Sequence, residues 1–336
     1  MTKAILLLSG GLDSTLAGKL LLELGIDVEA VNFVSPFCQC TPKSLGCSAA
    51  KKAAEQLGIP VKIFSTGMEY LEIIKKPKFG RGSGMNPCLD CRIHFFEHAK
   101  KYMNETGADF IATGEVLGER PMSQRRDAIE LIERESDLKG LILRPLSAKL
   151  FPPTIAEEKN LVDRNRLLDF HGRGRSPQIE LAEELGIKDF LCPAGGCRLT
   201  DPEFAVRLKD LFEHNPECGI NDVNILKFGR HYRISESAKA IVGRDKSENE
   251  SFENLASDGD ILLIPTYIPG PSVLCRGVLT EDEIKLAGRI AASHTKGGTV
   301  MEFEVKYPDN KPPEIISNVE PLDKETVIKL RIGTQS

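Results

Sequence analysis

Short β-branched runs alternate with amphipathic segments along the first two thirds of the chain. Apolar runs predict strands over residues 3–8, 28–34, 61–65 and 109–113, and helical spacing predicts helices over residues 12–24, 48–57 and 92–105. Such alternation is typical of βαβ units and a parallel sheet. The pattern therefore predicts a doubly wound α/β domain whose ligand lies beyond the carboxyl ends of the strands.

The pattern changes further along the chain. Residues 115–154 are rich in charges and helix breakers, which predicts irregular structure and short helices around a site. Further helices are expected over residues 177–185 and 202–214, and strands over residues 224–233, 241–242, 261–265 and 300–305. Two domains follow, residues 1–215 and residues 222–336, of which the second is a smaller α+β domain.

Composition narrows the class of protein. The chain has 336 residues, 41% of them hydrophobic, which is enough for two folded domains. Because no stretch reaches the roughly 18 apolar residues of a membrane span and no export signal is seen, a cytoplasmic location without membrane contact is expected. A net charge of −5 requires any RNA contact to use local basic patches.

The segment Ser9-Gly10-Gly11-Leu12-Asp13-Ser14 follows the first predicted strand and leads into the first helix. Two glycines allow backbone N–H groups to converge on an anion, the serines add hydroxyl donors, and the helix N-terminus favours negative charge. The segment lacks the Lys-Ser/Thr ending of a Walker loop. Cleavage of ATP between the α and β phosphates is therefore expected, rather than γ-phosphate transfer.

Nine cysteines indicate metal or sulfur chemistry rather than disulfides. Cys88 and Cys91 form a C-x-x-C pair before a predicted helix, whose dipole is expected to lower the thiol pKa. Together with Cys197 in a distant Gly-rich loop, they can ligate three irons of a [4Fe-4S] cluster and leave the fourth open to sulfide. Zinc held by Cys88, Cys91, Cys192 and Cys197 is the main metal alternative.

The remaining cysteines fall into two groups. Cys38, Cys40 and Cys47 form a C-x-C-x6-C group after the second predicted strand, where a second metal is an open alternative. Cys218 and Cys275 are isolated and are expected to be ordinary small apolar residues.

Polar residues in later loops provide further candidates. Gly114 follows a predicted strand and is expected to approach ATP closely, with Arg120 or Gln124 contacting phosphate or substrate. Basic clusters could follow an RNA backbone, and their members of interest are Lys78, Arg81, Arg144 and Lys149. A solvated charged surface is the alternative for these clusters, and Arg120, Arg144 and Arg173 could equally neutralise ATP phosphates.

The Ser9–Ser14 loop resembles that of the N-type, or PP-loop, ATP pyrophosphatases, a HUP-like superfamily that includes the argininosuccinate and GMP synthetases and the tRNA thiolases. This resemblance implies which residues bind ATP, namely Ser9, Gly10, Gly11, Asp13 and Ser14. Asp13 would act through Mg²⁺, and the backbone of Asn32 and Phe33 would hold adenine.

The segment Asn86–Cys91 and the later Cys197 resemble the tRNA 2-thiouridylases and 4-thiouridine synthetases over residues 1–200. Cys88 replaces the aspartate of the 2-thiouridylase segment N-P-D-x-x-C, and Glu115 replaces the histidine of its T-G-H segment. Because of Cys88, the chain looks more like the iron–sulfur-dependent thiolases, and the cluster is favoured. In a persulfide version of this chemistry, Cys197 would carry sulfur and Cys91 would assist.

The segments Gly243–Glu250 and Pro269–Ser272 resemble the NFACT-R RNA-binding module over residues 222–290. The resemblance implies that Arg244, Lys246 and Asn249 contact RNA phosphates and sugars. A β-rich dimerisation or lid domain is the alternative.

Together these observations predict an ATP-dependent tRNA sulfurtransferase with Asp13, Cys91 and Cys197 as catalytic residues. The enzyme would adenylate a uridine carbonyl oxygen, release pyrophosphate and replace the oxygen with sulfur, yielding AMP. Its partners would be tRNA and a sulfur donor, either sulfide or a persulfide carrier protein, and a homodimer is one option. Two alternatives stay open: a PP-loop enzyme transferring sulfur or nitrogen to a small molecule, and a non-catalytic ATP- and RNA-binding protein.

Overall fold

A computed structural model describes residues 1–38, 48–188, 190, 197–307 and 311–333. Cys40, Cys47 and Cys192 lie outside these described residues. The chain divides into two compact units, Met1–Thr200 and Asp201–Ser336. In the part of the chain that the structure describes, no helix is both long enough and apolar enough to cross a membrane.

The N-terminal unit is built on a parallel sheet of five strands in the order β3-β2-β1-β4-β5. The strands are β1 (Lys3–Leu7), β2 (Asp27–Val34), β3 (Val61–Ser65), β4 (Phe110–Thr113) and β5 (Ile142–Leu143). The strand order reverses between β1 and β4, and ligands of such sheets bind at that point, outside the carboxyl ends of the strands. The predicted doubly wound α/β fold is confirmed.

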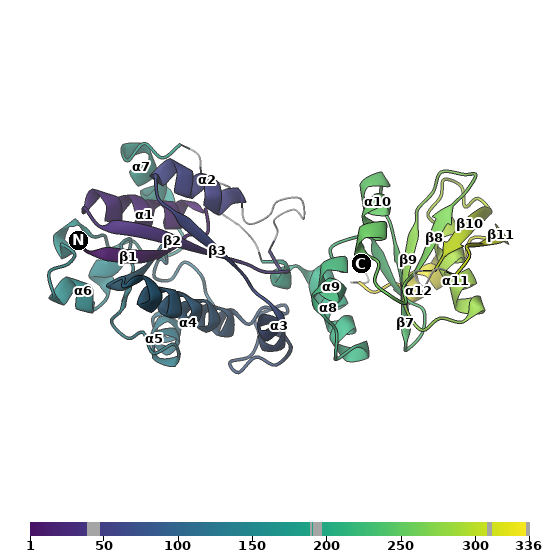
Figure 1. The fold of residues 1–336 in the computed structure, drawn as a ribbon, viewed down its shortest axis with the longest axis horizontal. Helices are drawn as coiled ribbons and strands as arrows, with labels where there is room; N and C mark the ends of the chain where they lie inside the picture. Colours follow the sequence, from purple (N-terminus) through teal and green to yellow (C-terminus); the bar gives the residue numbers. More distant parts are fainter. Residues whose placement is uncertain (39–47, 189, 191–196, 308–310, 334–336) are drawn as a thin grey trace. The chain divides into compact units, whose positions relative to one another are not determined.

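Helices cover both faces of this sheet (Figure 1). One face carries α1 (Leu12–Glu23), α2 (Ser48–Leu57) and α7 (Ser176–Glu184), and the other carries α4 (Cys88–Thr106) and α5 (Arg126–Glu135). Leu6 of β1 belongs to the apolar core under α1, whereas Ile5 packs in the core under α4. A central strand that is buried on both faces is typical of parallel sheets.

The structure differs from the predicted helices of this unit at two places. The segment expected to hold irregular structure and short helices contains α5, in which Ala128, Ile129 and Ile132 are buried with helical spacing. The short helix α3 (Met68–Lys75) precedes α4. The smaller elements are α6 (Ile155–Glu158) and 3₁₀ turns at Ala148–Leu150, Arg164–Arg166 and Arg198–Thr200.

The C-terminal unit contains an antiparallel sheet of six strands in the order β11-β10-β8-β9-β7-β6. The strands are β6 (Arg230–Arg233), β7 (Ala238–Val242), β8 (Ile261–Pro265), β9 (Val273–Gly277), β10 (Met301–Lys306) and β11 (Glu314–Val319). The helices are α8 (Pro202–His214), α9 (Ile220–Ile225), α10 (Lys246–Leu255), α11 (Glu281–Ala292) and α12 (Lys324–Leu330). The predicted α+β class of the second domain is confirmed.

The single strand expected over residues 224–233 is confirmed only over its last four residues. Helix α9 ends at Ile225, and β6 begins only at Arg230. The Asp222 side chain accepts a hydrogen bond from the Gly219 backbone N–H, which stabilises the start of α9. The assignment of separate functions to residues 1–215 and 222–336 stays a prediction.

Candidate ATP and thiol site

Close backbone packing and the hydroxyl groups of its serines fix the conformation of the loop between β1 and α1. Gly10 has a φ of +80°, and a Cβ there would lie 2.4 Å from the backbone of Ala49. The Ser14 hydroxyl donates to the Gly11 carbonyl over 3.0 Å and lies 3.1 Å from the Ser9 hydroxyl. The N-terminus of α1 therefore stands at the carboxyl end of β1, where free helix N–H groups attract anions.

Gly114 packs directly against this loop. It follows β4, and a Cβ at this position would lie 2.4 Å from backbone atoms of Asp13 and Ser14. Any side chain at residue 114 would therefore push the phosphate loop away from β4.

Asp13 has the surroundings of a cation ligand. Its Oδ2 lies 3.6 Å from the Arg175 guanidinium, which also pairs with Glu119. Burial and the charge of Glu119 raise the pKa of Asp13, while Arg175 and Arg120 oppose that rise. Among the described residues, the buried Oδ1 of Asp13 has no hydrogen-bond partner. An orphaned carboxylate oxygen near a second carboxylate fits Mg²⁺ held together with ATP.

The residues expected near adenine lie on β2, beside β1 in the sheet. The Asn32 amide donates to the Leu8 carbonyl over 2.8 Å, which ties β2 to the segment leading into the phosphate loop. The Phe33 ring stacks on Phe95, with centroids 4.9 Å apart, and on Phe64. That the backbone of Asn32 and Phe33 holds adenine stays a prediction.

The structure gathers four cysteines. Cys88 is the first residue of α4, and Cys91 lies in its first turn. The thiol of Cys91 interacts electrostatically with those of Cys88 and Cys197. Cys197 in turn interacts with Cys38, and the two form an isolated backbone bridge. Cys38, which the sequence placed in a separate group, therefore joins the predicted set.

The expected lowering of the Cys91 pKa by the helix dipole is wrong. Burial raises the pKa of the Cys91 thiol to about 12, although a 2.9 Å hydrogen bond with the Tyr70 hydroxyl favours the thiolate. Loss of hydration at the start of α4 thus outweighs the helix dipole. A bound metal would reverse this balance, because coordination deprotonates a thiol.

The spacing of the thiols bears on which group they could hold. Four thiolates on one zinc ion lie about 4 Å apart, given Zn–S bonds of about 2.3 Å. Among the described residues, the cysteines form no set of three or more whose ligand atoms all lie within 4.8 Å of one another. A [4Fe-4S] cluster distributes its cysteines over different irons, so it does not require them to lie that close together.

Arg120 relates the phosphate loop to the thiols. Its exposed guanidinium is close enough to act electrostatically on both the Asp13 carboxylate and the Cys197 thiol. The Gln124 side chain accepts a 3.0 Å hydrogen bond from the Arg120 backbone N–H, so it shapes this loop. The residues expected to bind ATP and those expected to handle sulfur are therefore both within electrostatic reach of Arg120.

Sequence reasoning missed two residues of this site. Glu119 stands in the loop that supplied Arg120, but its charge alone gave no sign that it faces Asp13. Arg175 ends the segment Gly172–Arg175, from which Arg173 was named as a phosphate contact instead. The pairing of Arg175 with Asp13 and Glu119 depends on how α7 returns to α1.

Two of the basic residues expected to meet RNA are engaged inside the N-terminal unit. The Arg81 guanidinium donates to the carbonyls of Ile74 and Lys75 at the end of α3. Arg144 is buried and pairs with Glu115 and Glu133. Because of this burial, Arg144 lies away from any surface that RNA can reach.

The other two basic residues of this unit are exposed, as Arg81 is. Lys78 pairs with Glu135 at 2.6 Å, and Lys149 donates to the Asn165 carbonyl over 3.0 Å. Neither contact buries the ammonium group, so both remain available to a polyanion.

In the C-terminal unit, hydrogen bonds connect the segments Gly243–Glu250 and Pro269–Ser272. The Asn249 amide donates to the Gly270 carbonyl, and its Oδ1 accepts from the Ser272 N–H over 3.1 Å. Arg244 forms a pair with Glu248, one turn along α10. Lys246 has a 91% exposed side chain and only a 3.8 Å contact with Glu250. Asn249 thus organises the surface, and Lys246 projects from it.

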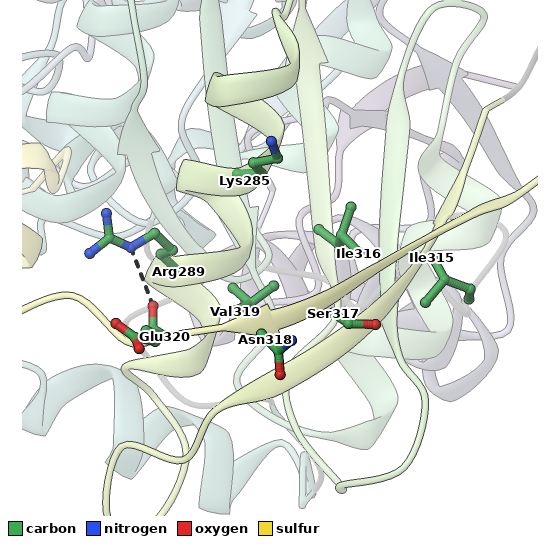
Figure 2. A pocket seen from close by; sticks show the side chains of 8 residues that line it. All are labelled: Lys285, Arg289, Ile315, Ile316, Ser317, Asn318, Val319 and Glu320. Carbon is green, nitrogen blue, oxygen red and sulfur yellow. Dashed lines mark hydrogen bonds between the residues drawn. The ribbon is translucent and has the colours of Figure 1, made fainter.

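A hollow of about 420 Å³ also lies in the C-terminal unit (Figure 2). It is lined by Lys285 and Arg289 of α11 and by Ile315–Glu320 in and after β11, and Arg289 donates to the Glu320 carbonyl. None of the residues predicted for ATP, thiol or RNA binding lines it.

Comparisons with known sequences place each unit in a class. Residues 1–149 match the family described as thiamine biosynthesis protein (ThiI), and residues 229–331 match the family described as NFACT protein RNA binding domain. The N-terminal part is a ThiI-like PP-loop ATP pyrophosphatase domain, and the C-terminal part is an NFACT-type RNA-binding domain. Both predicted resemblances are confirmed.

Among individual proteins, the chain resembles a tRNA-specific 2-thiouridylase, MnmA, of Sulfurimonas denitrificans. The two are 33% identical over 122 residues, which cover 35% of this chain and 36% of that protein. The chain spans about a third of the length of the first curated relatives it matches.

Two solved structures show a distant likeness to this chain. A 4-thiouridine synthetase in complex with RNA and bound ATP has a TM-score of 0.38 and 24% identity, covering 67% of this chain and 52% of its own. The U34-tRNA thiolase NcsA of Methanococcus maripaludis, solved with its [4Fe-4S] cluster, has a TM-score of 0.34 and 21% identity, covering 67% of this chain and 73% of its own.

Proposed function

We propose that the protein is an ATP-dependent tRNA sulfurtransferase that makes a thiouridine. The observation that carries this proposal is the position of Arg120, which acts electrostatically on both Asp13 of the phosphate loop and the Cys197 thiol. Thiols near the loop that would bind ATP favour an enzyme that couples ATP cleavage to sulfur chemistry. The NFACT-type domain supplies a reason for tRNA as the substrate.

In the first step, the uridine carbonyl oxygen attacks the α-phosphorus of ATP, and the bond to pyrophosphate breaks. The N-terminus of α1 and the Ser9–Ser14 loop would hold the departing pyrophosphate, with Asp13 and Glu119 holding Mg²⁺. Arg120 and Arg175 would offset the charge that develops on the phosphates. The product is a uridine carrying AMP on its oxygen.

In the second step, a sulfide sulfur attacks the activated carbon, the C–O bond breaks, and AMP leaves with the oxygen. Sulfur keeps its oxidation state, so this route requires no reductant. Cys88, Cys91 and Cys197 would hold a [4Fe-4S] cluster, which would supply a site for sulfide when bound. In the persulfide version, the outer sulfur of a Cys197 persulfide attacks the activated carbon and AMP leaves with the oxygen. The Cys91 thiol then attacks Cys197 Sγ, which breaks the S–S bond and releases the thiouridine, and an external thiol reduces the resulting Cys91–Cys197 disulfide.

The test is an anaerobic assay of iron-reconstituted protein with ATP, Mg²⁺, sulfide and unmodified tRNA. We expect a new thionucleoside by mass spectrometry of the digested tRNA. Asp13→Ala should lower pyrophosphate release on the order of 100-fold, comparable to removing one electrostatic contact to a transition state. Cys91→Ala should keep pyrophosphate release but lose the thionucleoside.

Cys275→Ala is the matched control, because this cysteine is buried in β9 of the other unit and should leave both readouts intact. AMP formed without any thionucleoside would favour a small-molecule substrate instead. Tight tRNA binding without AMP would favour a non-catalytic binding protein. Full thiolation by the Cys91→Ala variant would rule out the second step as written.

A further inference from the structure

A second cluster of metal-ligating side chains lies beside the thiols. Glu69 of α3 and His94 and His98 of α4 each present one ligand atom, and these atoms all lie within 4.8 Å of one another. The two histidines are one helical turn apart, so their side chains share a face of α4, with ring centroids 4.3 Å apart. None of these residues takes part in the site proposed for ATP, sulfur or RNA.

The hydrogen bonds around these side chains orient them as ligands. His98 Nδ1 lies 2.9 Å from the His94 carbonyl oxygen, so Nδ1 carries the proton and Nε2 keeps its lone pair. Fixing the tautomer through the second ring nitrogen is the usual arrangement of metal-binding histidines. One oxygen of Glu69 accepts from the Gly67 N–H over 2.9 Å, which holds the carboxylate in place.

The charges of the cluster suit a divalent cation. The hydrogen bond from Gly67 lowers the pKa of Glu69, so its side chain is a carboxylate at neutral pH. Burial, reinforced by the neighbouring His98, lowers the pKa of His94 to about 4, so its imidazole is neutral. Two imidazoles and one carboxylate are ligands that Zn²⁺ and Fe²⁺ accept, and they leave further coordination positions open.

The cluster is also reachable and mechanically connected to the thiols. Glu69 is exposed and His98 is half-buried, so a cation can enter from solvent. Tyr70 follows Glu69, packs its ring 5.4 Å from that of His94, and hydrogen-bonds Cys91. A cation held by Glu69 and the two histidines would therefore join α3 to α4 next to Cys91.

We propose that Glu69, His94 and His98 form a binding site for a divalent transition-metal ion, separate from the thiols. The site joins α3 to α4 and keeps Tyr70 against Cys91. Its existence does not depend on the proposed tRNA chemistry, because it can be measured on the full chain without ATP or RNA.

The test is a titration of the full-length protein, free of iron, with Co²⁺ under anaerobic conditions. We expect one Co²⁺ per chain with the visible absorption of nitrogen and oxygen ligands. His98→Ala and Glu69→Gln should each weaken this binding tenfold or more. Zn²⁺ should compete for the site and raise the melting temperature of the wild-type protein, but not of His98→Ala.

Two further variants separate the alternatives. His171→Ala is the matched histidine control, because His171 is exposed and belongs to no such group; it should bind Co²⁺ as the wild type does. Cys91→Ser should also retain this Co²⁺. Cobalt–thiolate charge-transfer bands that vanish in Cys91→Ser would report the thiols alone. Loss of the nitrogen- and oxygen-ligated Co²⁺ in Cys91→Ser, or its unchanged binding in His98→Ala, would overturn the proposal.

Discussion

Lys239 is a buried lysine near the ion pairs of Asp210 with Arg233 and of Asp222 with Arg276. It lies on β7, its ammonium group is buried, and it has no hydrogen-bond partner among the described residues. Burial lowers the pKa of Lys239 from 10.5 to about 8. Below pH 8 the folded protein must hold the charge in this site, which costs stability.

We therefore predict that Lys239→Met raises the free energy of unfolding at pH 7, by about 1 to 3 kcal/mol. Between pH 8 and 10.5 the unfolded chain binds the Lys239 proton and the folded protein does not, so wild-type stability rises relative to the variant. Urea denaturation of both proteins from pH 7 to pH 10 measures this. The prediction would be contradicted if the difference in the free energy of unfolding between Lys239→Met and the wild type did not shrink as pH rises. An equal gain in stability in Lys209→Met, at an exposed lysine, would also contradict it.

At the scale of elements, a buried ion network connects the end of β4 to α4 and β5. Glu115 follows β4 and is fully buried between Arg92 of α4 and Arg144, which follows β5. Burial raises the pKa of Glu115, but the two guanidinium groups outweigh this and lower it overall. Since Arg92 is adjacent to Cys91, the network also positions the thiol-bearing end of α4.

We predict that Glu115→Gln destabilises the N-terminal unit by about 3 kcal/mol or more, because it removes the counter-charge of Arg92 and leaves the buried Arg144 with Glu133 alone. The loss should be present above the ordinary Glu pKa of 4.5 and should diminish as pH falls through the lowered pKa of folded Glu115. Chemical denaturation of the wild type and the variant at pH 7 and in acid measures the stability loss and its decrease at low pH. Glu135→Gln, at the exposed Lys78 pair, is the control and should change stability little.

At the scale of the whole molecule, a net charge of −5 leaves RNA binding to local basic groups. Lys246 is the clearest example, because its side chain is 91% exposed at the start of α10. Lys209 on α8 has a similar i,i+4 contact, with Glu213 at 3.8 Å, but lies outside the residues that match the RNA-binding family.

We predict that Lys246→Ala weakens tRNA binding and lowers the slope of log affinity against log salt by about 1, whereas Lys209→Ala does neither. Fluorescence anisotropy with labelled tRNA at several salt concentrations measures both quantities. Equal effects of the two variants would mean that the tRNA contact is non-specific.

Local patterns were sufficient for much of this protein. The run of apolar residues before Ser9-Gly10-Gly11 defines β1 and the start of α1, because strand, glycine turn and helix are all specified by neighbours in sequence. The same holds for Cys88 and Cys91 at the start of α4, and for the Gly243–Glu250 segment. These features made the fold class and both domain families predictable from residues alone.

What only the tertiary structure decided involves residues far apart in the chain. Cys38 meets Cys197, Arg175 meets Asp13, and Glu69 meets His94 and His98 through the packing of α3 on α4. A local sequence pattern also does not show which polar side chains are buried. Arg144 is buried away from any surface that RNA can reach, and burial raises the pKa of Cys91. The sequence by itself determined which chemical groups are present; their partners and their exposure to water depend on how the strands and helices pack.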